Sequence, residues 1–231
     1  MKTKAVIFDV DGTLLDTEIL YTKAIDKVLE EFGKNLTRET KLKMMGRDST
    51  SATQILLNDT GIDISIVEFN RRVDILKDEI FKEAELIDGA EKLIRHLHKN
   101  KVPMSIATSS FRKFFQVKIT KHVELFSLFG EHVTCGDDPE VKRLKPHPDI
   151  YLVAKEKLDI PMLSCSECLV FEDAHNGVKS GVSAEMKVVW IPDDRFCTAV
   201  DIPDDCHGAH KVLKSLTEFS PEEFGLPPYD D

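Results

Sequence analysis

Two aspartates, Asp9 and Asp11, stand one residue apart directly after the apolar run of residues 5–8. That run predicts a short buried strand, and Gly12 after it lets the backbone turn close to a ligand. Two carboxylates in one small space raise the cost of ionising each other unless a cation lies between them. Because ligands of open α/β sheets bind beyond the carboxyl ends of the strands, the pattern indicates a metal or substrate site, although an ordinary Asp–Gly surface turn has the same composition.

Further polar groups of types that are common in active sites follow later in the chain. Thr108 comes directly after one predicted strand, and Glu172 and Asp173 come directly after another, while Lys145 precedes a proline in a loop. Each has a simpler explanation when it is taken alone. Thr108 would cap a helix, Lys145 would be a solvated lysine, and Glu172 and Asp173 would form the acidic first turn of a helix. Taken together and in this order, they indicate a catalytic set.

The stretch Asp9-Val10-Asp11-Gly12-Thr13 resembles the first motif of the haloacid dehalogenase-like phosphohydrolases, and the other motifs follow in that family's order. The resemblance covers the whole chain and extends to the family's helical-cap subclass. It implies an α/β fold, with a doubly wound parallel sheet in a Rossmann-like core and an inserted helical cap domain. It also implies a Mg²⁺-dependent phosphatase that hydrolyses a small phosphate monoester through an aspartyl-phosphate intermediate.

This chemistry needs positive charge, because a phosphate monoester is a dianion and a carboxylate must attack it. Mg²⁺ supplies such charge and prefers oxygen ligands. By resemblance, Asp9 is the nucleophile and a metal ligand, and Asp11 offers its backbone carbonyl to the metal. The Asp11 side chain is expected to protonate the leaving oxygen and then to take a proton from water. Asp173 completes the metal site by resemblance, and Glu172 joins it directly or through water.

Binding of the transferring phosphoryl group is expected to involve the residues after the second strand and one lysine. By resemblance, the Thr108 hydroxyl hydrogen-bonds the phosphoryl group, and the backbone N–H groups of Ser109 and Ser110 assist as donors just before a helix. Lys145 is expected to pair with both Asp9 and the phosphate, and to neutralise charge that grows in the transition state.

The first strand is followed by a block of helical patterns with no convincing strand. The predicted helices are residues 17–32, 37–43, 49–57 and 64–81. A single crossover between parallel strands needs far fewer residues. The sequence therefore predicts a helical cap domain at residues 17–85, linked to the core near residues 16–17 and 83–89.

The core is expected to comprise residues 1–16 and 86–231, where strand and helix patterns alternate. The predicted strands there are residues 102–107, 132–134, 169–171 and 187–191, with Val212 in a last one, and the predicted helices are residues 88–99, 112–122, 148–158 and 174–183. This alternation predicts a parallel sheet with helices on both faces. The tail at residues 220–231 contains three prolines and is expected at the surface.

The bulk composition indicates a soluble globular protein. The chain has 231 residues, a formal net charge of −10 and 42% hydrophobic residues. The negative charge argues against nucleic acid polymers, which bind mainly through Lys and Arg. No apolar run is long enough to span a bilayer, and the N-terminal run is too short for a signal peptide. We therefore expect a cytoplasmic protein that binds no membrane, and we expect a monomer.

Cysteine usage fits the same compartment. The motif Cys165-Ser166-Glu167-Cys168 has no second pair, so it is a weak candidate for a zinc or redox site. The five cysteines are expected to be reduced.

Within the family, four stretches resemble the pseudouridine-5′-phosphatase branch, which belongs to nucleotide metabolism. The stretches are residues 107–110, 136–141, 168–178 and 224–229. The resemblance implies a small phosphorylated metabolite as partner, namely the nucleoside monophosphate pseudouridine 5′-monophosphate. Thr13 departs from this branch, which can have leucine at that position.

Three alternatives stay open. A phosphatase of sugar or polyol phosphates shares all of the chemistry. A β-phosphoglucomutase-like phosphomutase shares the fold and the nucleophile, but it has a cap histidine where this chain has Tyr21. A non-catalytic phosphate-binding protein would need neither Asp9 nor Asp11.

The cap is expected to select the substrate, since every phosphate monoester presents the same reacting group. Arg47, in the break Gly46-Arg47-Asp48 between two predicted helices, either reaches the substrate or is a solvated loop residue. Pseudouridine has an N–H where uridine has a C–H, and Asp48, Ser49 and Asn70 are candidate acceptors for it.

Overall fold

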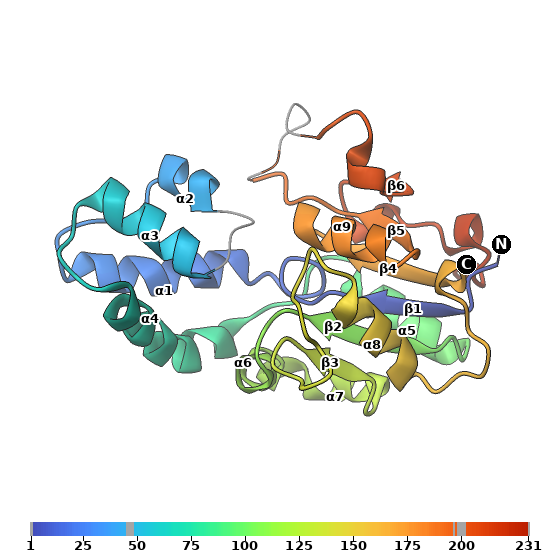
Figure 1. The fold of residues 1–231 in the computed structure, drawn as a ribbon. Coiled ribbons are helices and arrows are strands. Elements are labelled where there is room, and N and C mark those ends of the chain that lie inside the picture. The colour runs from blue at the N-terminus through green and yellow to red at the C-terminus, as the bar shows by residue number, and fades with distance from the viewer. Residues whose placement is uncertain (1, 45–48, 196, 198–201, 231) are drawn as a thin grey trace.

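The computed structural model describes residues 2–44, 49–195, 197 and 202–230. Its centre is a six-stranded parallel sheet in the order β3-β2-β1-β4-β5-β6 (Figure 1). The strands are β1 (Ala5–Phe8), β2 (Met104–Thr108), β3 (Val133–Cys135), β4 (Cys168–Glu172), β5 (Lys187–Trp190) and β6 (Lys211–Val212). The predicted doubly wound α/β fold is confirmed, because the chain runs outward from the central strand β1 in both directions.

Helices cover both faces of the sheet. They are α5 (Ala90–Lys99), α6 (Arg112–Lys118), α7 (Val123–Phe126), α8 (Asp149–Lys157) and α9 (His175–Ser183). All of β1 is buried, and its alternate side chains face opposite sides. Val6 and Phe8 belong to a core cluster with α5, α6 and α7, whereas Ala5 and Ile7 belong to one with α8 and α9. The sheet is therefore packed between two apolar layers.

A group of helices between β1 and α5 lies beyond the carboxyl ends of the strands (Figure 1). These helices are α1 (Glu18–Glu30), α2 (Arg38–Met44), α3 (Ser49–Thr60) and α4 (Ile66–Ile80), followed by the 3₁₀ turn η1 (Phe81–Glu83). Ser65 caps α4, since its Oγ accepts a hydrogen bond of 3.2 Å from the backbone N–H of Glu68. Leu56, Phe69 and Val73 are buried among these helices, so the group has an apolar interior of its own.

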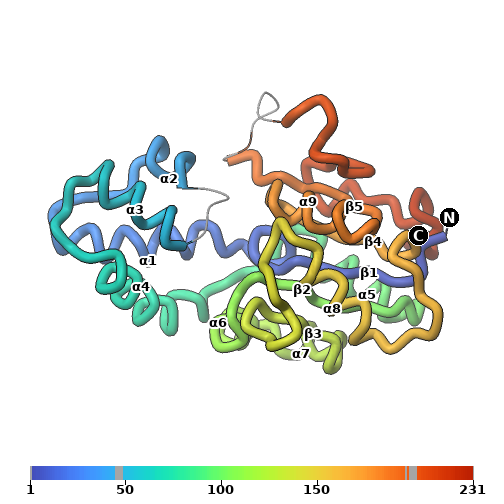
Figure 2. The backbone as a smooth tube through the Cα atoms, viewed as in Figure 1, coloured from blue at the N-terminus to red at the C-terminus, as the bar shows by residue number. Residues whose placement is uncertain are grey.

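Two chain segments connect these helices to the sheet, and they lie side by side (Figure 2). The backbone N–H of Asp16 donates to the carbonyl of Glu85 at 3.0 Å, and the N–H of Ile87 donates to the carbonyl of Leu14 at 2.9 Å. The Arg195 guanidinium donates to both carboxylate oxygens of Asp16, at 2.8 and 3.0 Å. The connection thus consists of two segments, near residues 14–16 and 85–87, that are hydrogen-bonded to each other. An ion pair with Arg195, from a loop distant in the sequence, contacts the first of them.

The predicted helix at residues 112–122 is wrong in its extent. The helix α6 ends at Lys118, and the short turns η2 (Thr120–His122) and η3 (Ser127–Phe129) flank α7. The Thr120 hydroxyl donates to the carbonyls of Gln116 and Val117, at 3.3 and 2.7 Å. A side-chain hydroxyl that competes for backbone carbonyls in this way favours an early end to a helix.

The tail is more firmly packed than a surface tail is expected to be. Leu226 is buried, the Phe224 carbonyl accepts from the Thr3 N–H at 3.1 Å, and the Tyr229 ring lies 4.6 Å from the His96 ring. The remaining 3₁₀ turns of the described residues are η4 (Cys165–Glu167), η6 (Cys206–Gly208), η7 (Leu216–Glu218) and η8 (Pro221–Phe224). Cys165 and Cys168 carry free thiols, as expected.

Asp138, in the loop after β3, forms ion pairs with a residue of α6 and a residue of α8. Its buried carboxylate accepts hydrogen bonds from Arg112 Nη2 at 2.6 and 2.8 Å and from Lys157 Nζ at 2.5 Å. Burial alone would raise the pKa of Asp138, but the hydrogen bonds from Lys157 and Arg112 outweigh it and lower that pKa. Cys135, Asp137 and Asp138 lie close enough to hold a metal ion. Because two side-chain cations already bind Asp138, this group is structural.

Asp138→Asn is expected to lower the free energy of unfolding by about 1.5–3 kcal/mol at neutral pH, the range for hydrogen bonds to charged groups. A carboxyl with a lowered folded-state pKa stabilises the fold above its unfolded pKa, and this contribution disappears as the pH falls through the folded pKa. The difference between wild type and variant should therefore shrink near about pH 3. Urea unfolding at both pH values measures it, with the exposed Glu140→Gln as control. An equal difference at both pH values would contradict the ion-pair explanation.

Candidate active site

The ends of three neighbouring strands bring the predicted residues together. Phe8, the last residue of β1, pairs with Ile106 of β2 and with Phe171 of β4. Asp9 therefore emerges between the end of β2, which is Thr108, and the end of β4, which is Glu172. This is the topological switch point of the sheet, where open α/β folds bind ligands.

A buried lysine joins two of these carboxylates. Lys145 Nζ donates to Asp9 Oδ1 and to Glu172 Oε1, both at 2.6 Å, and to the Ala107 carbonyl at 3.0 Å. The Lys145 side chain is only 9% exposed. Glu172 Oε1 also accepts from the Tyr151 hydroxyl at 2.5 Å. Lys145 thus lies where the sequence predicts it, with its charge between Asp9 and Glu172.

The site remains short of positive charge. Burial raises the pKa of Asp9 to about 7; Lys145 opposes this effect, whereas Glu172 and Asp11 add to it. Burial, followed by the charges of Asp9 and Glu172, raises the pKa of Asp173 well above its ordinary value. A cation placed among these carboxyls would stabilise their ionised forms.

The donor set fits a divalent cation. Carboxylate oxygens of Asp9, Glu172 and Asp173 all lie within 4.8 Å of one another, and such oxygens are the ligands of hard cations. Two glycines make room for them: a Cβ would lie 2.2 Å from Asp173 Oδ2 if added at Gly12, and 1.8 Å from Glu172 Oε1 if added at Gly177. Gly12 also has a φ of +87°, which L side chains rarely adopt.

Asp11 lies beside this cluster and is held by donors on both oxygens. Its Oδ1 accepts from Thr17 Oγ1 at 2.8 Å and from Lys118 Nζ. Its Oδ2 accepts from Ser110 Oγ at 2.7 Å and from Thr108 Oγ1 at 3.3 Å. Burial would raise the pKa of Asp11, but the Lys118 charge and these hydrogen bonds outweigh it and lower the pKa. In this arrangement the Asp11 side chain is a carboxylate.

The residues after β2 differ in detail from the sequence prediction. The Ser110 backbone N–H, predicted to bind phosphate, donates here to Thr108 Oγ1 at 3.1 Å, and the Ser110 side chain contacts Asp11. Ser109 is exposed at the end of the strand. Arg47 and Asp48, the predicted cap contacts, lie outside the described residues.

Sequence reasoning missed two buried residues of the site, Lys118 and Tyr151. Lys118 follows Phe115 by three residues, so it lies on the apolar face of α6, and a lysine on such a face is a signal for a buried partner. Tyr151 is fully buried on α8, and a buried tyrosine hydroxyl usually finds a hydrogen-bond partner. Their partners could not be identified without the fold.

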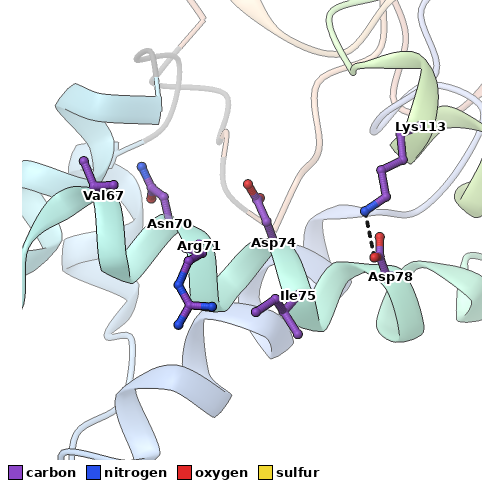
Figure 3. Close-up of a pocket in the computed structure, with 7 residues that line it drawn as sticks. All are labelled: Val67, Asn70, Arg71, Asp74, Ile75, Asp78 and Lys113. Atoms are coloured by element: carbon purple, nitrogen blue, oxygen red, sulfur yellow. Dashed lines mark hydrogen bonds and ion pairs between the residues drawn. The ribbon is translucent and has the colours of Figure 1, made fainter.

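A hollow of about 410 Å³ lies along α4 (Figure 3) and is separate from this cluster of carboxylates. Its lining residues are Val67, Asn70, Arg71, Asp74, Ile75, Asp78 and Lys113, none of which belongs to the predicted catalytic set. Figure 3 shows Lys113 reaching from α6 to Asp78 on α4, and the two side chains form an ion pair of 2.7 Å. Asn70 Oδ1, a candidate acceptor for the substrate, accepts from Thr53 Oγ1 at 2.7 Å.

Comparison with known proteins agrees with this geometry. Residues 3–185 match the haloacid dehalogenase-like hydrolase family. The chain is 41% identical over 230 residues to a Drosophila melanogaster protein described as a probable pseudouridine-5′-phosphatase, covering 100% of this chain and 97% of that one. It is 40% identical over 229 residues to (DL)-glycerol-3-phosphatase 2 of Arabidopsis thaliana, covering 98% and 92%.

A solved structure shows the same fold. The crystal structure of a family IA, variant 3 hydrolase from Entamoeba histolytica superimposes with a TM-score of 0.77 at 27% identity, covering 97% of this chain and 98% of that one. The chain belongs to the haloacid dehalogenase-like hydrolase family. The predicted enzyme class, a phosphoric monoester hydrolase, is confirmed. Across the described residues, every helix is too short or too polar to cross a membrane.

Proposed function

We propose that this protein is a Mg²⁺-dependent phosphatase that hydrolyses a small phosphate monoester through an aspartyl-phosphate on Asp9. The observation that carries this proposal is the buried contact of Lys145 with Asp9 and Glu172, next to Asp173. One cation and three carboxylates leave net negative charge at the end of the sheet. A phosphate dianion enters such a site only together with further positive charge.

The reaction divides into two displacements at phosphorus. A carboxylate oxygen of Asp9 attacks, an Asp9–phosphorus bond forms, and the bond from phosphorus to the leaving oxygen breaks. Asp11 gives its proton to that leaving oxygen, so it must take up a proton before this step. Asp11 then takes a proton from a water molecule that attacks phosphorus, which releases phosphate and regenerates Asp9.

The proposal includes a set of metal ligands. Asp9, Asp173 and the backbone carbonyl of Asp11 would hold Mg²⁺ directly. Glu172 is already bound by Lys145 and Tyr151, so its contribution would be to hold Lys145 and to support the site indirectly. When bound, Mg²⁺ neutralises charge on the phosphoryl group.

The helices of residues 17–85 would act as a cap that excludes water from the aspartyl-phosphate. Support comes from the paired connecting segments, where the backbone N–H of Asp16 donates to the carbonyl of Glu85. Thr17 starts the cap and also donates to Asp11. A hinge motion of the two connecting segments would therefore expose or cover the site at the ends of the strands.

The substrate proposed is pseudouridine 5′-monophosphate, a nucleoside monophosphate. Support comes from the Drosophila relative at 41% identity and from the four stretches noted in the sequence. Glycerol 3-phosphate is the second candidate, because the Arabidopsis relative is similar to the same degree, at 40% identity. The carboxylate cluster serves either reaction, so the cap must decide between them.

We expect kcat/KM for pseudouridine 5′-monophosphate to exceed that for uridine 5′-monophosphate about ten- to a hundredfold. A cap acceptor left without the extra N–H would be buried and unpaired, which costs about 1–3 kcal/mol. Phosphate release from both nucleotides and from glycerol 3-phosphate, measured with Mg²⁺, tests this expectation. Chelation by EDTA should abolish release, and added Mg²⁺ should restore it.

The outcomes test the substrate and the metal-dependent mechanism separately. Equal values for the two nucleotides, or a preference for glycerol 3-phosphate, would end the pseudouridine assignment and leave the phosphatase mechanism in place. Phosphate release that is unaffected by EDTA would contradict the metal site itself.

A further inference from the structure

Lys118 is a buried lysine that the mechanism above does not use. Its side chain is 0% exposed. Its Nζ donates to Asp11 Oδ1, to Ser110 Oγ at 2.7 Å and to the Tyr21 hydroxyl at 3.1 Å. An ammonium has three donors, so these contacts satisfy it completely. Removing such a charge from water is costly, and only well-placed partners offset that cost.

The contacts of Lys118 come from both sides of the boundary between core and cap. Lys118 belongs to α6 and Ser110 to the loop after β2, whereas Tyr21 belongs to α1. The ammonium also lies 4.7 Å from the centre of the Phe81 ring and 5.0 Å from that of Tyr21. Aromatic faces attract a cation at such distances. The helix α1 and the turn η1 of the cap therefore contact a charge that the core supplies.

Asp11 is the anion at the centre of this arrangement. Among the donors that contact it within the described residues, Thr17, Thr108 and Ser110 offer neutral hydroxyls and Lys118 offers a charge. Charge-assisted hydrogen bonds are roughly twice as strong as neutral ones. Lys118 therefore contributes most to fixing the direction in which the Asp11 carboxyl points.

We propose that Lys118 is a positioning residue that orients Asp11 for proton transfer to the leaving oxygen, and that Tyr21 and Phe81 make this orientation depend on the packing of the cap. The role is one of orientation and not of acidity, because the positive charge of Lys118 by itself disfavours uptake of a proton by Asp11. The inference rests on the acid–base role proposed for Asp11. It assigns to Lys118 no contact with substrate or metal. The two buried lysines thus have different partners among the aspartates: Lys145 binds Asp9, and Lys118 binds Asp11.

The test uses a leaving group as a measure of proton transfer. The para-nitrophenolate ion leaves without much help from an acid, whereas phenolate itself is more basic and needs more help. In Lys118→Met, kcat for phenyl phosphate should fall at least about tenfold further than kcat for para-nitrophenyl phosphate. KM should change less than kcat. In an Asp11→Asn background, Lys118→Met should add no further difference between the two substrates.

A matched control is available on the same helix. Lys113→Met removes another lysine of α6 that pairs with a cap carboxylate, that of Asp78, but its side chain is 64% exposed. The ratio of the two rates should stay at the wild-type value in this variant. If Lys118→Met does not fold, as judged by circular dichroism, Tyr21→Phe removes one partner of Lys118 while keeping the ring, and it should change the ratio in the same direction by a smaller factor.

An equal loss on both substrates in Lys118→Met would overturn the proposal, because a purely structural lysine would not distinguish leaving groups. A smaller loss on phenyl phosphate than on para-nitrophenyl phosphate would overturn it too, because Lys118 would then act on the acidity of Asp11 and not on its orientation. If Lys118→Met does not fold, an unchanged ratio in Tyr21→Phe would overturn it as well. A wild-type protein that releases phosphate from neither aryl phosphate would instead contradict the proposed function, so the two failures are distinguishable.

Discussion

Replacing Asp9 with asparagine is expected to reduce turnover by roughly 10⁴-fold or more, the loss that follows removal of a catalytic nucleophile. The amide has nearly the size of the carboxylate, so the surrounding structure can stay as it is. Lys145 loses one partner but keeps Glu172 and the Ala107 carbonyl. The variant should therefore bind substrate while failing to form the aspartyl-phosphate.

The fold of this variant should be intact. Burial raises the pKa of Asp9, so ionisation of this carboxyl lowers the stability of the folded protein. A neutral amide avoids that cost. In metal-free buffer at neutral pH, the Tm of Asp9→Asn should accordingly equal or exceed that of the wild type. The exposed Asp63→Asn, a change of the same chemistry on the surface, serves as control and should keep wild-type turnover.

Two measurements address the covalent step. Beryllium fluoride with Mg²⁺ should inhibit the wild type by mimicking phosphoryl on a carboxylate, and a chiral phosphate ester should be hydrolysed with retention at phosphorus, because two displacements each invert it. Inversion at phosphorus, or substantial turnover by purified Asp9→Asn, would exclude the aspartyl-phosphate.

The fold could be predicted because its signals are local and repeated. The strands β1, β2 and β4 are short, largely apolar runs, and each is followed by turn residues and then a helix. Parallel strands place their carboxyl ends at one edge, so Asp9, Thr108 and Glu172 could be grouped before any coordinates were known. The pairing of Phe8 with Ile106 and Phe171 is the register that this grouping requires.

What could not be predicted depends on contacts between residues distant in the sequence. Lys118 and Asp11 are 107 residues apart, and Tyr151 and Glu172 come from different elements. Periodicity identifies a face of a helix, but it does not identify the side chain that will lie opposite. Similarly, the family resemblance predicts that the Ser110 backbone N–H binds the phosphoryl group, but not that this N–H donates to Thr108 while the Ser110 side chain donates to Asp11.

The substrate is another feature that could not be predicted from the sequence of the core. The reacting phosphate is common to all candidates, so the core residues carry no information about the rest of the molecule. Asn70 is already hydrogen-bonded to Thr53, which makes it a less available acceptor than the sequence suggests. The relatives divide between a nucleotide-type and a polyol-type phosphatase at nearly equal identity, and kinetic comparison is the measurement that decides.

Lys145→Ala is expected to lower kcat by roughly 10²–10³-fold, the usual loss when one group that stabilises developing charge is removed. Asp9, Glu172 and a bound phosphate dianion would then face one another with one positive charge fewer. Glu172 would keep the Tyr151 hydroxyl, so the effect should fall mainly on Asp9 and the phosphoryl group.

The affinity for Mg²⁺, unlike kcat, should not fall in Lys145→Ala. Lys145 donates to Asp9 Oδ1 and Glu172 Oε1, and these carboxylates belong to the cluster that would hold Mg²⁺. Removing a competing cation should therefore leave the affinity for Mg²⁺ unchanged or increase it. Titration calorimetry with Mg²⁺ and steady-state kinetics on the same preparation would show a loss of kcat without a loss of metal affinity.

Two further variants define the role of Lys145. Lys145→Arg should restore little activity, because a planar guanidinium is wider than an ammonium and would not fit between two oxygens that each lie 2.6 Å from Nζ. Lys142→Ala changes an exposed lysine of the same loop and should retain wild-type kinetics. Turnover by Lys145→Ala within about threefold of the wild type, below the tenfold that 1.4 kcal/mol represents, would refute the role of this charge. A parallel loss of Mg²⁺ affinity would instead show that Lys145 acts by holding the carboxylates in place.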